Sequence, residues 1–154
     1  MSRSLLAFAA VLLLSLSTTT FAASADERAA AAAETRQGLL KVVGSYFGPI
    51  YAMVREQIPY DGELVKANAE KIATLLPMIP DVFRANTSAY DLDTESLDEI
   101  WDNIDDFNAK ASASAEKAAA LAAAADQGQG AAMKAFGEMG GSCKACHDNY
   151  RLQN

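Results

Sequence analysis

Apolar residues recur at helical spacing over most of the chain, and β-branched residues are sparse. The first such segment is Asp26–Gln57; Gly48-Pro49 is predicted to bend it and Pro59 to end it. A second helix is predicted over Asp61–Met78, with Asp61 as its N-cap. Both segments carry an apolar stripe, so each is expected to pack one face against other helices.

Two further helices follow a long connection. The prolines and polar residues of 77–94 predict a crossover loop with a short turn near Val82-Phe83. Ser96-Leu97-Asp98-Glu99 has the pattern of a capping box and predicts the start of a third helix that continues to about Asp126. A Gly-rich break separates it from a fourth helix, predicted from Ala131 onward. The expected fold class is all-α, an antiparallel four-helix bundle with one long crossover loop.

The N-terminal segment is predicted to be a secretory signal peptide. A basic residue precedes an apolar run, Leu5–Leu16, that is followed by small residues and is too short to span a bilayer as a helix. Cleavage is predicted after Ala25, with Ala22 as the alternative. Residues 1–25 are then removed, and residues 26–154 form one domain, expected in the periplasm without membrane insertion.

The charge of the chain narrows the range of partners. The full sequence has 13 Lys+Arg and 20 Asp+Glu, a net charge of −7, and the loss of the one arginine in residues 1–25 makes it −8. An acidic surface disfavours nucleic acid and anionic lipid. No nucleic-acid partner is therefore expected.

The residues that carry chemistry lie near the C-terminus. Cys143-Lys144-Ala145-Cys146-His147 is a C-x-x-C-H pattern, and on a helix its first, fourth and fifth positions share one face. Two thiols on that face can bond to the two vinyl groups of a porphyrin while the imidazole ligates the iron. The sequence predicts one covalent haem c, attached through Cys143 and Cys146, with His147 as the axial iron ligand.

Other uses of the same residues agree less well with the sequence. Thiol–disulfide enzymes place C-x-x-C at a helix N-terminus next to a strand, whereas this pair falls in the last turns of a predicted helix. Structural zinc needs four side-chain ligands, and the chain has two cysteines and one histidine. A disulfide across so short a loop constrains the unfolded chain little, and it would leave His147 without a role.

The ending C-x-x-C-H-x-x-Y-R, from Cys143 to Arg151, resembles that of cytochrome c′, a family of four-helix-bundle haem proteins. Further matching positions are Arg36-Gln37, Phe47-Gly48, Pro59-Tyr60-Asp61 and Ile100-Trp101. The resemblance implies that Arg36 and Gln37 lie at the haem edge, where the guanidinium pairs a propionate, and that Glu95 contacts the haem. Without the resemblance, Arg36 would be a solvated helix charge and Glu95 an acid in the first turn of a helix.

The resemblance also implies which residues lie on the two sides of the iron. Arg151, one turn after His147, flanks the proximal imidazole or else complements the dipole of the helix C-terminus. Leu40, one turn after Arg36, points over the ring where low-spin relatives have a methionine. Leucine cannot ligate iron, so a five-coordinate, high-spin iron is expected. The expected distal pocket is apolar and consists of Leu40, Val43, Phe47 and Trp101.

These features predict a haem protein that binds nitric oxide and carbon monoxide and passes single electrons to a redox partner protein, with no catalytic turnover of its own. An apolar pocket without a hydrogen-bond donor disfavours bound dioxygen. The alternatives are a low-spin, six-coordinate electron carrier of the same bundle family and a thiol oxidoreductase. Because family members often pair through their first two helices, a homodimer is expected.

Overall fold

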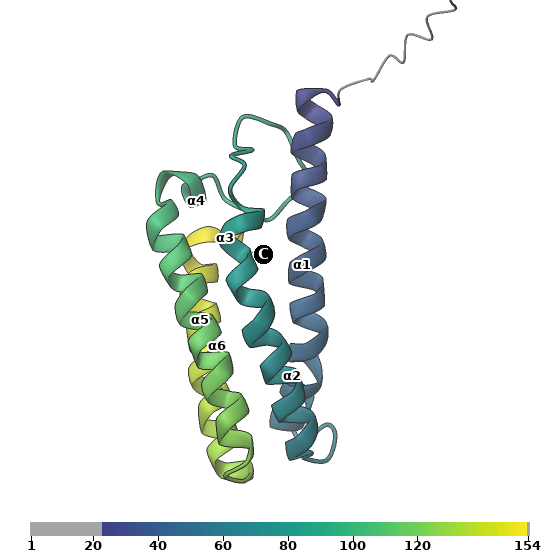
Figure 1. Cartoon of the computed structure of the whole chain (residues 1–154), viewed down its shortest axis with the longest axis vertical. Coiled ribbons are helices and arrows are strands. Elements are labelled where there is room, and N and C mark those ends of the chain that lie inside the picture. The colour runs from purple at the N-terminus through teal and green to yellow at the C-terminus, as the bar shows by residue number, and fades with distance from the viewer. Residues whose placement is uncertain (1–22, 154) are drawn as a thin grey trace, which may run out of the picture.

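The computed structural model describes residues 23–153, which form a helical bundle without a β-sheet (Figure 1). The four long helices, which run antiparallel in chain order, are α1 (Ala25–Val54), α2 (Gly62–Leu75), α5 (Ile104–Ala125) and α6 (Gln129–Tyr150). The connection between α2 and α5 contains η1 (Leu76–Met78), α3 (Ile79–Val82) and α4 (Glu99–Asp102). The predicted all-α class is confirmed, and most of the predicted signal peptide lies outside the described residues.

A capping box closes the first turn of α1. Ser24 Oγ accepts a hydrogen bond from the Glu27 N–H at 3.1 Å, and the Glu27 carboxylate accepts one from the Ser24 N–H at 2.7 Å. These reciprocal bonds satisfy two N–H groups that have no partner inside the helix. The sequence did not predict this box, because cleavage after Ala25 would remove its serine.

The other helix ends lie within a few residues of their predicted positions. α1 continues through Pro49 and ends at Val54, shortly before Glu56, which has a φ of 57°. Asp61 caps α2 as predicted, its carboxylate accepting from the Leu64 N–H at 3.0 Å. α6 begins after Gly128, whose φ of 98° favours glycine, two residues earlier than predicted.

The third predicted helix starts differently. Ser96 pairs with Arg151 in an isolated antiparallel bridge, and its N–H donates to Thr94 Oγ1 at 3.2 Å. The residue that precedes α4 is Asp98, and no side chain accepts a capping hydrogen bond at the start of that helix, so the predicted capping box at 96–99 is wrong. A short α4 begins at Glu99 instead, and Asn103, with φ −129° and ψ 41°, interrupts the helical path before α5.

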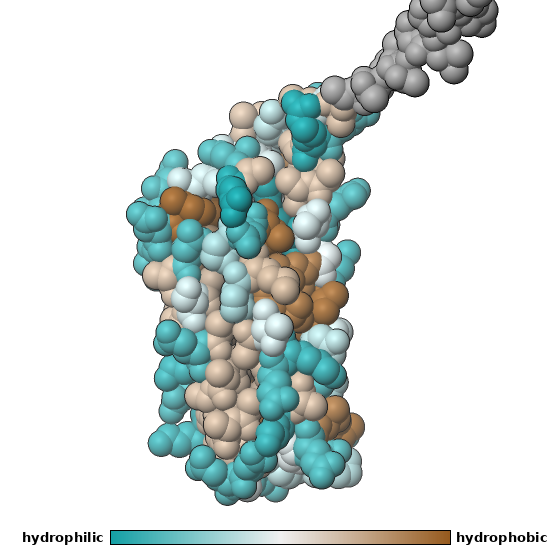
Figure 2. Space-filling model, viewed as in Figure 1, coloured by the Kyte–Doolittle hydropathy of each residue, from teal (hydrophilic) through white to brown (hydrophobic). Residues whose placement is uncertain are grey.

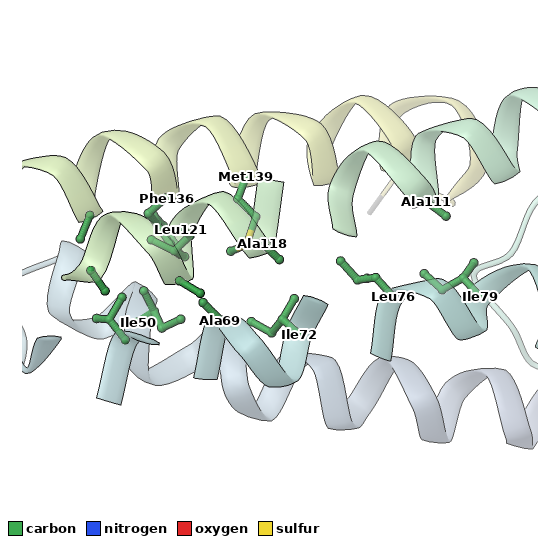
Figure 3. Packing of buried hydrophobic residues seen from close by; sticks show 14 of the residues in the cluster. Ile50, Ala69, Ile72, Leu76, Ile79, Ala111, Ala118, Leu121, Phe136 and Met139 are labelled. Atoms are coloured by element: carbon green, nitrogen blue, oxygen red, sulfur yellow. The ribbon is translucent and has the colours of Figure 1, made fainter. Parts of the chain in front are cut away.

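The apolar core runs between α2, α5 and α6 (Figure 3). Alanines such as Ala111 and Ala118 occupy much of the inner face of α5, so the neighbouring helices approach closely and enclose Ile72, Leu121 and Met139. α1 packs mainly against α2 and α3 and makes little contact with α6. Within residues 23–153, none of the helices combines the length and apolar character that crossing a membrane requires.

Candidate haem site

The Cys-x-x-Cys-His motif lies in the last turns of α6, so the three side chains share one face of that helix. Both cysteines are free and half-buried against α5, where Cys143 contacts Ser114. Burial raises the pKa of both the Cys143 and Cys146 thiols. Thiol–disulfide exchange uses a thiolate of lowered pKa, so the environment of this pair disfavours the thiol-oxidoreductase alternative.

His147 is exposed, although enough protein surrounds its ring for partial burial, together with the positive charge of Arg151, to lower its pKa. A lower pKa favours the neutral imidazole, which is the form that ligates metals. Among residues 23–153, no group of three or more His, Cys, Asp and Glu side chains gathers into a metal-binding cluster. Two thiols and an imidazole on one helical turn suit covalent attachment of a porphyrin and ligation of its iron.

Two stretches of helix contain no buried residue, namely 37–49 of α1 and 140–149 of α6. Both helices bury residues on either side of these stretches. Leu40 is 40% exposed, although it lies one turn from the buried Arg36, and Phe47 packs against Phe136 of α6 with ring centroids 5.0 Å apart. An apolar plate held by the two cysteines would cover these stretches, so the residues fit a haem.

Arg36 joins the middle of α1 to the crossover loop and is only 2% exposed. Its three donor nitrogens bond, at 2.8–3.1 Å, to Thr87 Oγ1, the Ala85 carbonyl and the Val82 carbonyl. The guanidinium also lies 5.1 Å from the centres of the Phe83 and Trp101 rings. Burial lowers the pKa of Arg36, and no acidic side chain of the described residues pairs with it.

The other predicted haem-edge residue, Gln37, and Trp101 of the predicted distal pocket also hold the crossover loop. Gln37 donates from Nε2 to the Asp93 carbonyl at 2.8 Å. Trp101 donates from Nε1 to the Phe83 carbonyl at 3.0 Å, while its ring covers one face of the Arg36 guanidinium. A guanidinium has five N–H groups, and the loop uses three of them, so Arg36 retains donors for a haem carboxylate.

Glu95 forms an ion pair with Arg151, which lies four residues along the chain from His147. Both Nε and Nη2 of Arg151 lie 2.6 Å from Glu95 Oε2. Glu95 precedes α4 by four residues, so it is not an acid in the first turn of a helix. Arg151 follows the last residue of α6 and donates its N–H to the His147 carbonyl at 3.1 Å.

Three residues that support this site were not predicted from the sequence. Thr87 and Phe83 complete the surroundings of Arg36. Asp106 of α5 accepts a hydrogen bond at 2.5 Å from the Tyr150 hydroxyl, which raises the pKa of Tyr150 to about 12 and fixes the last turn of α6. An aromatic residue within a polar loop was a signal for Phe83, but nothing local distinguishes Thr87 or Asp106 from surface residues.

A helical bundle whose last helix presents two thiols and an imidazole on one turn defines a c-type cytochrome. The family model described as cytochrome C′ matches residues 31–151. A cytochrome c′ from Cereibacter sphaeroides is 40% identical over 122 residues, covering 78% of this chain and 82% of the relative. The chain therefore belongs to the cytochrome c′ family, which binds haem c.

Solved structures agree with this assignment. A cytochrome c prime from Shewanella frigidimarina superposes with a TM-score of 0.73 at 33% identity, covering 81% of this chain and 97% of the other. The nitric oxide complex of a mutant cytochrome c prime from Alcaligenes xylosoxidans superposes with a TM-score of 0.67 at 35% identity, covering 79% and 94%.

Replacing Arg36 with methionine tests its role in the loop. Arg36→Met keeps the packing between the two rings but leaves loop acceptors without donors, which should lower the free energy of unfolding by about 2 kcal/mol. Arg84→Met is the control, because this exposed arginine pairs only with Asp81, and its effect should be below about 0.5 kcal/mol. Urea unfolding measures both, and equal losses would contradict a structural role for Arg36.

Proposed function

We propose that this protein is an exported haem protein with a five-coordinate, high-spin iron, which binds nitric oxide and carbon monoxide and transfers single electrons without catalytic turnover. The observation that carries the proposal is the side-chain set of α1. One face of α1 presents, at helical spacing, Arg36, Leu40, Val43 and Phe47. None of these side chains ligates iron. The haem would supply the redox-active iron, with His147 as its protein ligand.

The methionines of the described chain support an open distal side. Met53 and Met139 are buried in the core, and Met78 is exposed on η1. Met133 lies near the start of α6, about 15 Å along the helix from Cys143. None of them lies between residues 37 and 49 of α1, the stretch that contains Leu40.

The apolar character of this face favours binding of nitric oxide and carbon monoxide over dioxygen. Bound dioxygen is polar and is stabilised by a hydrogen-bond donor in the distal pocket. Leu40, Val43 and Phe47 have no such donor, and Gln37 already donates to the crossover loop. The relative that was solved as a nitric oxide complex gives the proposal a precedent in the same family.

The haem edge is proposed to lie at Arg36. Its remaining N–H groups would hold a propionate, which would neutralise a buried charge that has no acidic partner among the described residues. Gln37 would act at the same edge, whereas Trp101, which is expected in the distal pocket, would hold Arg36 in place by packing against it. Electrons would then pass between the haem and a redox partner protein.

We also propose a homodimer that forms through α1 and α2. These helices enclose a surface groove of about 330 Å³ lined by Val42, Tyr46, Ala67, Glu70, Lys71, Thr74 and Leu75. Val42 is 43% exposed, and Figure 2 shows hydrophobic residues gathered over the middle of α1. A second copy of the chain would cover this apolar surface.

Export to the periplasm is proposed with cleavage after Ala22 rather than after Ala25. Ser24 is the N-cap of α1, and loss of such a cap costs about 1 kcal/mol. Cleavage after Ala22 keeps the capping box with Glu27, whereas cleavage after Ala25 removes it.

The open distal side is tested by Leu40→Met. A thioether above the iron should convert a high-spin spectrum toward a low-spin one and weaken carbon monoxide binding in proportion to its occupancy of the site. The matched control is Val42→Met, on the groove side of the same helix, which should leave the spectrum unchanged. A low-spin spectrum of the unmodified protein would instead establish the six-coordinate electron carrier.

The dimer is tested by Val42→Glu. A carboxylate buried in an apolar interface should raise the dissociation constant of the dimer roughly 100-fold, which corresponds to about 3 kcal/mol. Leu152→Glu is the control, because this exposed leucine lies far along the chain from α1 and α2. Light scattering coupled to size exclusion gives the mass, and a monomeric unmodified protein at micromolar concentration would refute the dimer.

The cleavage site is tested by the N-terminus of the exported protein. Intact mass and N-terminal sequencing of periplasmic material should give a chain that begins at Ala23. A chain that begins at Asp26 would show that α1 functions without its capping box, and an unprocessed N-terminus would contradict export by a cleaved signal peptide.

A further inference from the structure

The turn that follows the haem ligand is attached to the crossover loop by backbone hydrogen bonds. The Leu97 N–H donates to the Tyr150 carbonyl at 3.1 Å, and the Leu152 N–H donates to the Glu95 carbonyl at 2.8 Å. The last carbonyl groups of a helix lack partners within the helix, and helix ends fray when those groups stay free. Here a second segment closes the end of α6 three residues after His147.

One side chain adds to this attachment. Glu95 Oε2 accepts a hydrogen bond from Arg151 Nε at 2.6 Å and forms an ion pair with Nη2 at 2.6 Å, and the two side chains are each 47% exposed. The backbone bridge between Ser96 and Arg151 already holds the two segments together, so the ion pair forms without a further cost in loop-closure entropy. The pair therefore favours one direction of the chain as it leaves α6.

The loop that supplies Glu95 is itself anchored at a second place. Arg36 bonds to Thr87 and to loop carbonyls, and Gln37 bonds to the Asp93 carbonyl. Glu95 lies two residues beyond that last anchor. The crossover loop thus links the Arg36 region of α1 to the end of α6.

We propose that Glu95 is a positioning residue for the haem ligand: by holding Arg151 it fixes the last turn of α6 and, with it, the direction of the His147 imidazole toward the iron. The proposal rests on the proposed function only in that His147 is the iron ligand. Glu95 acts through Arg151, and its carboxylate need not touch the haem.

The test compares haem-loaded Glu95→Ala with the unmodified protein. An exposed ion pair changes local stability little, so the Arg151 and Leu152 amides should exchange with solvent only about threefold faster. The iron–histidine stretching band in the resonance Raman spectrum of the reduced protein should broaden or shift, because the imidazole then samples several directions. Glu95→Gln keeps an acceptor oxygen and should lie between the two, and Glu99→Ala on α4 is the control that should change neither measurement.

Each result decides the proposal. Faster exchange with an altered iron–histidine band in Glu95→Ala, partly restored in Glu95→Gln, supports it. Faster exchange with an unchanged band would overturn it, since Glu95 would then only close the helix end, and unchanged exchange would overturn it as well. If the unmodified protein shows no five-coordinate band, the proposed spin state fails, while the exchange comparison and the low-spin spectrum of each variant still test Glu95.

Discussion

The buried guanidinium of Arg36 constrains the end of the bundle that carries the haem motif. A charge removed from water needs acceptors for its donors, and α1 offers none around Arg36. The crossover loop supplies them, so residues 82–87 must pass close to the middle of α1. The Phe83 and Trp101 rings both pack against the guanidinium, their own centres 6.5 Å apart; Phe83 directly follows α3, and Trp101 lies in α4.

Helical periodicity was sufficient to predict the long helices, and the Cys-x-x-Cys-His spacing was sufficient to predict that the three side chains share one turn of α6, because both are local patterns. The errors arose where a distant segment decides the local conformation. Ser96 has the sequence of a helix cap but pairs with Arg151, which lies 55 residues further along the chain. Ser24 was missed for a different reason, since the predicted processing site excluded it from the fold. The partners of Arg36 could not be predicted, because Thr87 resembles any polar loop residue.

Burial along the helices distinguishes the core from the candidate haem site. The core between α2, α5 and α6 extends along the bundle, and α1 adds the buried Ile50 and Met53 near its C-terminal end. The stretches 37–49 and 140–149 contain no fully buried residue, so apolar side chains such as Val43 and Phe47 are only partly removed from water by folding alone. Binding of a haem between them would add that burial, and the stability of this half of the molecule would then depend on the cofactor.

The contacts around the turn that carries His147 are mostly polar, and such contacts fix the orientation of side chains more than they stabilise the fold. Exposed ion pairs contribute about 0–1 kcal/mol, so the pair between Glu95 and Arg151 adds little to the free energy of unfolding. An iron–imidazole bond, however, depends on the angle at which the ring approaches. Tyr150, bonded to Asp106, fixes the same turn from the side of α5. Two polar anchors from different helices and loops can therefore set the geometry of His147, although neither contributes much to the stability of the fold.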